Sequence, residues 1–596
     1  MPNTMNNRQQ PLSSEHTLFW CPPLAGKTPP LSTLWYPLPL CPTVEQRLAL
    51  VEQLDRPLAH SEQQRVDQFL QQWPHWQVSC FNSARPAKTK ECAYLLIIVD
   101  TANAHELDNL LTQAVDYCQA HQLRHIMVIT DRPDATCPPT MNSQISVSSS
   151  LTVRFLTQPS HHASLIAAAQ AVVVFQSGLG FEALLWQKPV MVLGTPFYAG
   201  LGLTQDPLPA LANLSLSQLI YGVLFELTAN YCPETQQEVP IEQALQWLHE
   251  QNMQRWRFAE HIYAIGFSVF WRPVVAAFFQ GSHVHFVKQP QQVPADSTAV
   301  IWGRKAVSAL ADNVTLYRLE DGFLRSVGLG ILFTKPLSWV VDSRGLYFDA
   351  TCPSDLEVLL SQQRFSLNQL EQAQALRQCL LQHHISKYNT GVAHWQRPAT
   401  HKKVLLVVGQ VERDASLAFG APGLKKNIEL LQHVRLNNPN AYLIYKPHPD
   451  VLAGGRAQGE NEQKAHNICD EIAENVDIST MLELVDEVHV LTSLAGFEAL
   501  LRGTKVFCYG LPFYAGWGLT QDTEHCPRRQ RRLTLDELVA GTLIHYPLYL
   551  SKQSGYYSNA LATANALAQW RANPKQQTTL WHRMLRKCIN LVRGKQ

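Results

Sequence analysis

The chain has 596 residues and a formal net charge of +1, and 46% of its residues are hydrophobic. It is long enough for several domains with cores of their own, and the near-zero charge excludes a nucleic-acid binder that relies on a strong overall field. The 13 cysteines stand singly, without the paired spacing of a zinc site, so we interpret them as reduced core thiols. Neither a basic-then-apolar leader nor a long apolar run is evident, and we expect a cytoplasmic protein that does not span the membrane.

The predicted elements begin with short helices, such as one around Val44–Leu54, in a segment rich in Pro, Gln and Leu. Residues 241–278 are then interpreted as a helical connector. Buried strands that alternate with helices are predicted on both sides of this connector. Before it they lie at 93–100, 125–130, 171–175 and 190–194, and after it two such series begin at 283–287 and at 403–409. Such alternation predicts parallel, doubly wound sheets.

One stretch of 32 residues occurs twice in similar form. Residues 175–206 read FQSGLGFEALLWQKPVMVLGTPFYAGLGLTQD and residues 491–522 read LTSLAGFEALLRGTKVFCYGLPFYAGWGLTQD. A constant offset of 316 aligns the two without a gap, and 19 of the 32 positions are identical. This self-similarity indicates a duplicated unit, so the two copies can be compared position by position.

Two loops of the second copy carry polar side chains that suit a nucleotide. YKPHPD (445–450) follows an apolar strand, and Lys446 and His448 there could meet a phosphate, although the same letters also fit a proline-stiffened surface turn. TSLAGFEALL (492–501) opens a helix whose first amides, with Ser493, suit an anion, ordinary N-capping being the alternative. Glu498 stands too far along this helix for a capping box, and ribose hydroxyls are a natural partner for it.

The loop GLPFYAGWGLT (510–520) contains Gly510, Pro512, Tyr514 and Gly516, which would let backbone approach a ligand closely. Arg528 and Arg529 follow it and could neutralise anions. A tightly packed turn between a strand and a helix explains the same loop equally well.

Acidic residues end two further strands. Asp414, in GQVERDAS (409–416), is aimed at the cleft as a nucleophile or base, although a lone loop aspartate is more often a turn former. Glu320, Asp321 and Arg325 lie in LEDGFLRSVGLG (319–330), which fits acceptor binding or a salt-bridged turn. No His and carboxylate cluster has metal-ligand spacing, so we predict no metal site.

Eight motifs occur in one order within about 250 residues, namely WGRK, LEDGFLRS, VVDSRGLYFDA, SKYN, GQVERDAS, YKPHPD, TSLAGFEALLRG and GLPFYAGWGLT. Together they closely resemble the KpsC-type capsule polysaccharide β-Kdo glycosyltransferases of Gram-negative bacteria. The resemblance implies a cytoplasmic enzyme that uses CMP-Kdo as donor substrate, with no other cofactor, and builds β-linked Kdo on a phosphatidylglycerol lipid. It also implies partners at the inner-membrane surface and among other capsule biosynthesis and export proteins.

The same resemblance implies retaining, metal-independent transfer and roles for named residues. The family's nucleophilic aspartate matches Asp414, and His448 is expected to assist catalysis by stabilising the departing phosphate. CMP would be held by Lys446, His448, Ser493 and Glu498. Glu320 and Asp321 are assigned to the acceptor side, and the sugar's carboxylate needs a cation, for which Arg413 and Arg325 are both candidates.

The predicted fold is α/β, with a GT-B-like pair of Rossmann-type domains in the C-terminal half preceded by a degenerate Rossmann-type repeat. The predicted domains are a poorly defined N-terminal region (1–90), a degenerate nucleotide-binding-like repeat (91–235), the helical connector (236–280), an acceptor-side Rossmann-like domain (281–400), a CMP-sugar-binding Rossmann-like domain (401–550) and a C-terminal helical basic tail (551–596). The GT-B assignment at this level is an analogy between folds.

The first copy departs from the motifs of the second. ITDRPD (129–134) aligns with YKPHPD and places Thr130 opposite Lys446 and Arg132 opposite His448. The loop that carries Asp414 is shortened, and we find no match to LEDGFLRS, WGRK or SKYN within 1–128. The retained residues, such as Ser177 and Glu182, shape a helix and a turn, so we interpret the first copy as an inactive module.

The tail WHRMLRKCINLVRGKQ (581–596) alternates apolar and basic residues, which fits an anionic membrane surface or a solvated helix. Two other functions stay open for the chain. A GT-B transferase that uses another nucleotide sugar would prefer UDP to CMP. A scaffold for capsule assembly would lack catalysis, yet it gives no reason for the second copy to keep Asp414, Lys446 and His448.

Overall fold

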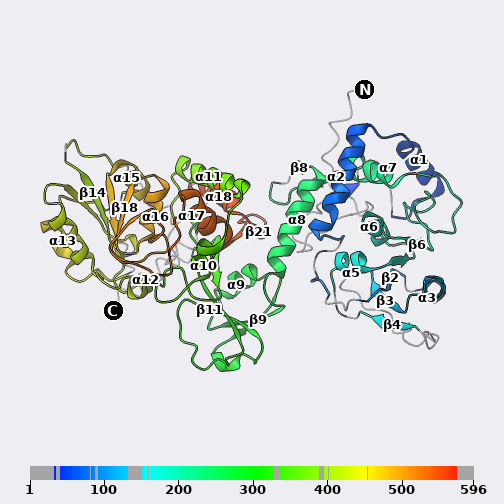
Figure 1. The fold of residues 1–596 in the computed structure, drawn as a ribbon, viewed down its shortest axis with the longest axis horizontal. Helices are drawn as coiled ribbons and strands as arrows, with labels where there is room; N and C mark the ends of the chain where they lie inside the picture. The colour runs from blue at the N-terminus through cyan, green and yellow to red at the C-terminus, as the bar shows by residue number, and fades with distance from the viewer. Residues whose placement is uncertain are drawn as a thin grey trace. The chain divides into compact units, whose positions relative to one another are not determined.

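The computed structural model describes residues 32–34, 40–131, 151–327, 334–387 and 395–572, apart from positions 81, 83, 88–91, 102, 157, 159, 236, 401, 453, 455 and 475. The chain divides into two compact units, unit 1 (Met1–Arg257) and unit 2 (Phe258–Gln596), which are drawn in Figure 1. The basic tail 581–596, Arg132 and the last two residues of SKYN lie outside the described residues. None of the described helices is long and apolar enough to cross a lipid bilayer.

Unit 1 contains a five-stranded parallel sheet, which we call the repeat sheet of unit 1. Its strand order is β4 (Thr152–Phe155), β3 (His125–Thr130), β2 (Leu95–Val99), β5 (Ala171–Val174) and β6 (Val190–Val192). The central strands are buried on both faces and therefore read as continuous apolar runs. The helix α3 (Ala104–Ala120) packs on one face, and α5 (His162–Ala168) and α6 (Leu179–Leu185) pack on the other.

A smaller sheet and a group of helices complete unit 1. The sheet has the antiparallel order β1 (Ser32–Leu34), β7 (Thr228–Tyr231) and β8 (Glu238–Val239). The helices are α1 (Val44–Leu54), α2 (His60–Trp76), α7 (Leu216–Ile220), a π-helical turn η1 (Tyr221–Glu226) and α8 (Ile241–Trp256). Thr43 and Gln46 form a capping box at the start of α1, which explains why that helix begins where it does.

Unit 2 contains the second copy of the repeat in a six-stranded parallel sheet, the repeat sheet of unit 2. Its order is β16 (Glu471–Ile472), β15 (Tyr442–Lys446), β14 (Val404–Val408), β17 (Glu487–Val490), β18 (Lys505–Cys508) and β19 (Gln521–Asp522). One face is covered by α13 (Asn427–Asn437) and the short α12 (Ala415–Gly420), and the other by α15 (Ile478–Leu484) and α16 (Leu494–Leu501). Helices α13 and α16 flank the strands in Figure 1.

The other sheet of unit 2 has seven strands and is called the seven-stranded sheet. Its order is β10 (His283–Val287), β9 (His261–Ile265), β11 (Thr298–Trp302), β12 (Thr315–Asp321), β13 (Ser338–Asp342), β20 (Pro547–Leu550) and β21 (Tyr557–Ser558). The first four strands are parallel and the rest are antiparallel. Its helical neighbours are α9 (Arg272–Phe278), α10 (Asp355–Gln362), α11 (Leu367–Gln382), α17 (Leu535–Val539), the π-helical turn η5 (Ala540–His545) and α18 (Ala560–Ala572).

The predicted fold class is confirmed, because unit 2 holds two Rossmann-type sheets and unit 1 holds a repeat of one of them. The helical connector over 236–280 is wrong in its second half, where β9 forms a strand between β10 and β11. The segment HIYAI follows α8 after four residues that include no glycine or proline, so the sequence does not mark where the helix ends. The boundary at 550 also differs, since β20 and β21 return to the seven-stranded sheet.

The two repeat sheets share one strand order, with β4-β3-β2-β5-β6 matching β16-β15-β14-β17-β18. Their registers agree as well, because Val99 pairs with Thr130 where Val408 pairs with Lys446. Each unit also has a helix that continues into a π-helical turn, η1 in one and η5 in the other. The duplication read from the sequence therefore extends to topology.

Candidate functional site

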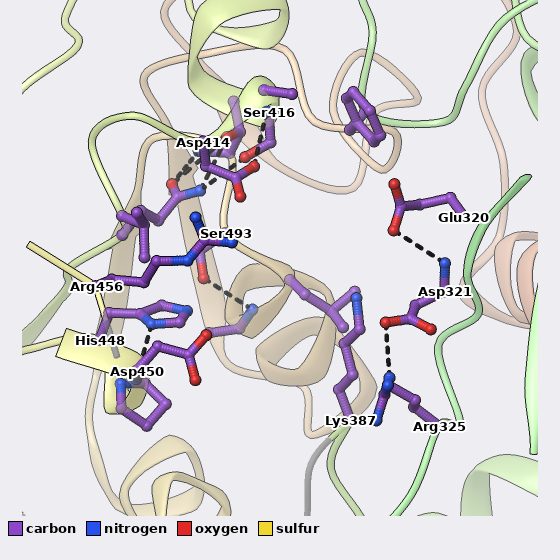
Figure 2. A pocket seen from close by; sticks show the side chains of 18 of the residues that line it. Glu320, Asp321, Arg325, Lys387, Asp414, Ser416, His448, Asp450, Arg456 and Ser493 are labelled. Atoms are coloured by element: carbon purple, nitrogen blue, oxygen red, sulfur yellow. Dashed lines mark hydrogen bonds and ion pairs between the residues drawn. The ribbon is translucent and has the colours of Figure 1, made fainter. Parts of the chain in front are cut away.

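A cavity of about 1150 Å³ in unit 2 opens between the repeat sheet and the seven-stranded sheet. Its walls come from loops at the carboxyl ends of strands in both sheets, which is where open α/β sheets bind ligands. Glu320, Asp321 and Arg325 lie on one side in Figure 2, and Asp414, Ser416, His448, Asp450, Arg456 and Ser493 lie on the other, with Lys387 between them. The cavity thus brings together most of the residues singled out from the sequence.

Asp414 stands at the N-terminus of α12, in the loop that follows β14. Its Oδ1 accepts the backbone N–H of Ser416 at 2.9 Å, so the carboxylate caps the helix and its orientation is fixed. Gln410 of the same loop bonds Thr492, with the Thr492 N–H donating to Gln410 Oε1 at 2.8 Å. The two loops that border the carboxylate are therefore tied together.

Lys446 and His448 follow β15 and line the same cavity. Lys446 Nζ donates to the carbonyl of Val476 at 2.8 Å, and burial lowers the pKa of this lysine to about 8. The N–H of Asp450 donates to His448 Nδ1 at 3.1 Å, so the neutral ring carries its proton on Nε2 and can donate there. Burial lowers the pKa of His448 as well.

Ser493 caps α16, and its Oγ accepts the N–H of Ala495 at 3.3 Å. Glu498 lies one turn further along and is 9% exposed, and burial raises the pKa of its carboxyl. Its Oε1 accepts the backbone N–H of Lys387 at 2.9 Å. Glu498 therefore ties the chain after α11 to the helix, which is a partner the sequence did not reveal.

Glu320 and Asp321 end β12 on the opposite wall. Arg325 Nε donates to Asp321 Oδ2 at 2.6 Å, and the Asp321 N–H donates to Glu320 Oε1 at 3.0 Å. Burial raises the pKa of Glu320 to about 7, and the neighbouring Asp321 adds to the rise. Because Arg325 is buried and paired with Asp321, this pair forms a salt bridge in the wall, one of the two alternatives left open from the sequence.

Four of the predicted residues do not line the cavity. Pro512 lines it, whereas Arg413, Gly510, Tyr514 and Gly516 do not. Tyr514 is fully buried and its hydroxyl donates to the carbonyl of Ser493. A Cβ on Gly510 would come within 2.9 Å of the Gly420 carbonyl oxygen, and Gly516 has φ +84°. Gly510, Tyr514 and Gly516 therefore shape the packed turn beneath the site.

Arg528 and Arg529 do not face a ligand, which corrects the expectation that they neutralise its anions. Both pair with the buried Glu357, through Arg528 Nε at 2.5 Å and Arg529 Nε at 2.9 Å. Arg529 also donates to the carbonyl of Ala515 at 2.9 Å. They anchor the turn to α10.

Sequence reasoning missed several polar residues of the cavity, among them Lys387, Gln410, Ser416 and Arg456. Three of them lie inside or beside quoted motifs, because Lys387 belongs to SKYN and the loop GQVERDAS supplies Gln410 and Ser416. Arg456 lies beyond the YKPHPD motif, and only the fold brings it back to the cavity. Lys387 projects into the centre of Figure 2 and adds a cation between the two walls.

Unit 1 contains a counterpart of the contact between Glu498 and Lys387, and with it a partial match to SKYN. Glu182, which aligns with Glu498, accepts Ser79 Oγ at 2.8 Å and the N–H of Cys80. Ser79 and Cys80, which follow α2 and begin SCFN, therefore stand where Ser386 and Lys387 follow α11 and begin SKYN, and Cys80 takes the place of Lys387. The match was missed because two of its four letters differ.

Two Rossmann-type sheets that face a common cleft define the class of unit 2 as a GT-B arrangement. The chain matches a family model described as "Capsule polysaccharide biosynthesis protein" over residues 128–218 and 297–549, which is more than half of its length. The chain belongs to this capsule polysaccharide biosynthesis family.

The family's relatives are bacterial surface-polysaccharide proteins. The chain is 38% identical over 472 residues to the capsule polysaccharide modification protein LipA of Neisseria meningitidis serogroup B, spanning 76% of this chain and 67% of LipA. It is 40% identical over 296 residues to the lipopolysaccharide-processing protein LpsZ of Rhizobium meliloti, spanning 47% of this chain and 67% of LpsZ. A solved structure named Thermosulfurimonas dismutans KpsC, beta Kdo 2,7 transferase, is 39% identical, covers 52% of this chain and 100% of its own, and has a TM-score of 0.44.

Proposed function

We propose that unit 2 transfers Kdo from CMP-β-Kdo to a Kdo-bearing phosphatidylglycerol lipid with retention of the β configuration, as a step in building the lipid anchor of a capsule polysaccharide. The observation that carries the proposal is the single cavity in which Asp414 and Glu320, from two facing sheets, meet Lys446 and His448. Membership of the capsule family and the eight motifs in one order support it.

The donor's nucleotide is assigned to the repeat-sheet wall. Lys446, His448 through Nε2–H, and the first amides of α16 beside Ser493 supply positive charge and donors for the phosphate. Glu498 bounds this wall beside the backbone of Lys387. Lys387 and Arg456 add cations for the carboxylate of the sugar.

The first displacement uses Asp414 as nucleophile. Its carboxylate oxygen forms a bond to the anomeric carbon of Kdo while the bond from that carbon to the CMP phosphate oxygen breaks, and CMP leaves. His448 and the helix amides stabilise the charge that develops on the departing phosphate. The covalent Kdo adduct has the inverted configuration.

The second displacement restores the β configuration. The acceptor hydroxyl attacks the anomeric carbon, gives its proton to Glu320, and releases Asp414 as a free carboxylate. A base with a pKa of about 7 is matched to this task near neutral pH, and Glu320 has such a value because it is buried beside Asp321. The two acids thus take different roles on opposite walls.

Unit 1 is assigned no transfer activity. Its chain passes from β2 to α3 through residues 100–103, whereas unit 2 places residues 409–426, with α12 and Asp414, between β14 and α13. Thr130 and Cys80 stand in place of the cations Lys446 and Lys387. We further propose that the enzyme needs no metal, works at the cytoplasmic face of the inner membrane, and meets other capsule biosynthesis and export proteins there.

The test is mass spectrometry of the full chain incubated with freshly made CMP-Kdo and a lipid-like acceptor that already carries β-Kdo. Addition of a single Kdo is the expected result, with CMP binding that UDP does not compete and that His448→Ala weakens. Repeated additions would contradict the inactivity of unit 1. No addition despite intact CMP binding would favour a scaffold or a different sugar and would overturn the proposal.

A further inference from the structure

The segment that joins β9 to α9 forms a tight turn at the edge of the seven-stranded sheet. Gly266 has φ +70°, and its N–H donates to the carbonyl of Val287 at 2.9 Å. The N–H of Trp271 donates to the carbonyl of Ser268 at 3.0 Å, which closes a β-turn with Val269 and Phe270 at its two central positions. The hydrogen bonds fix the apolar tip in place.

This tip is unusually apolar for an exposed turn. Val269 is 76% exposed and Phe270 is 42% exposed, and the two are consecutive. Leu367 and Leu436 are exposed to a similar degree, at 81% and 80%, but each stands singly on a helix, which is ordinary for a soluble surface. Two adjacent large apolar side chains at the tip of a turn leave water only when another phase or molecule covers them.

The turn also borders the cavity. Gly266, Phe267, Ser268 and Trp271, which flank the tip on both sides, all line it. They lie on the wall that carries Glu320 rather than on the wall assigned to the nucleotide. Whatever covers the tip therefore lies next to the acceptor side of the cavity.

Basic residues stand at the same edge of the sheet. Strands β9, β10 and β11 are parallel, so the residues that follow them gather at one edge, and these include Gly266, Lys288 and Lys305. Both lysines are exposed, and Lys305 lines the cavity. Arg272, directly after the turn, lies over the ring of Phe286 at 5.1 Å. An apolar tip with basic residues at the same edge of the sheet is complementary to an anionic bilayer surface.

We propose that the turn 268–271 inserts Val269 and Phe270 into the headgroup region of an anionic membrane, with Lys288 and Lys305 meeting lipid phosphates beside it. Docking at this point turns the acceptor side of the cavity toward the bilayer, so a lipid-anchored acceptor reaches Glu320 without leaving the membrane. The docking itself is independent of the reaction, whereas the delivery of an acceptor rests on the proposed function.

The test is co-sedimentation of the full chain with vesicles of phosphatidylglycerol and phosphatidylcholine. The double variant Val269→Ser with Phe270→Ser should bind these vesicles roughly tenfold more weakly, since it removes the two apolar side chains that would be buried in the membrane. The matched control, Leu367→Ser with Leu436→Ser, removes equally exposed apolar side chains elsewhere and should bind as the parent does. CMP affinity, measured by calorimetry, should be the same in all three proteins, which shows that the cavity is intact.

Vesicle binding does not depend on sugar transfer, so this result stands even if the donor proves to be another sugar. Equal binding by the parent and the turn variant would overturn the proposal. Hydrogen exchange gives a second measurement, in which added vesicles should slow exchange in residues 266–272. If instead the turn variant abolished self-association of the chain while vesicle binding persisted, the tip would be a contact between protein molecules and the membrane assignment would be wrong.

Discussion

Units 1 and 2 share a repeat sheet but differ at the edge that borders the cavity in unit 2. Both place the same serine and tyrosine beneath the first turn of a helix, since Tyr198 donates to the carbonyl of Ser177 as Tyr514 does to that of Ser493. A Cβ on Gly180 or Gly496 would collide with that tyrosine hydroxyl, at 2.1 Å and 2.2 Å, so glycine is required in both. These identical tyrosines and glycines therefore maintain packing in both units and do not report on activity.

The difference lies in loops and charges. Unit 1 has Asp100 directly after β2, where its carboxylate accepts the N–H of Gln176, the residue that aligns with Thr492, and burial raises the pKa of Asp100 to about 6. The corresponding tie in unit 2 is made by the neutral Gln410. An acid in the place of an amide, together with the loss of two lysines, makes the edge of unit 1 unsuited to a phosphate. Four changes would break or sharpen this contrast, and they follow from the largest expected effect to the smallest.

Asp414→Asn should make unit 2 as inactive as unit 1. An amide cannot form the covalent adduct, so we expect the rate of Kdo transfer to fall by about a thousandfold or more. The affinity for CMP, measured by calorimetry, should stay within about twofold of the parent value, since the substitution keeps the N-cap. An active Asp414→Asn enzyme would remove Asp414 from the role of nucleophile.

Glu320→Gln should lower kcat by roughly a hundredfold to ten-thousandfold because the acceptor loses its base. Only the carboxylate form accepts a proton, and the pKa of Glu320 is about 7, so the parent rate should rise as the pH passes through 7. The variant should lack that rise in its pH–rate profile. A parent profile that is flat between pH 6 and 8 would contradict the assignment.

The double variant Lys387→Cys with Lys446→Thr gives unit 2 the residues that unit 1 has at these positions. Charged hydrogen bonds are each worth about 1.5–3 kcal/mol, so CMP-Kdo affinity should fall by about a hundredfold or more. Calorimetry with a donor analogue measures this. The reverse change in unit 1, Thr130→Lys, should leave the affinity unaltered, and a gain there would mean that unit 1 keeps a usable site.

Glu182→Gln should affect stability alone. Burial raises the pKa of Glu182 to about 8, above its unfolded value, so the folded state holds a proton that the unfolded state has lost. The free energy of unfolding should therefore fall as the pH rises from about 4.5 to 8. Between pH 6 and 8.5 the parent should lose about 2 kcal/mol that the variant retains. Scanning calorimetry of both proteins checks this, and transfer activity should not change.

The repeat, the strand order of both repeat sheets and the residues of one wall follow from the sequence because buried parallel strands are short apolar runs that end in polar loops. The roles of Glu498, Arg528 and Arg529 do not follow, since their partners Lys387 and Glu357 lie more than 100 positions away in the chain. Strand β9 was hidden because it follows helix α8 after only four residues, RFAE, with no glycine or proline to mark the end of the helix. Alignment at one fixed offset also concealed SCFN, which the contact with Glu182 reveals.

The seven-stranded sheet has one consequence for the order in which the protein forms. Strand β13 pairs with β20, more than 200 residues later, so this sheet lacks its last strands until the whole repeat sheet has left the ribosome. Chains usually acquire structure from the N-terminus as they emerge. Here the wall that holds Glu320 is finished last. A nascent chain therefore completes its cleft only after the repeat-sheet wall is already in place.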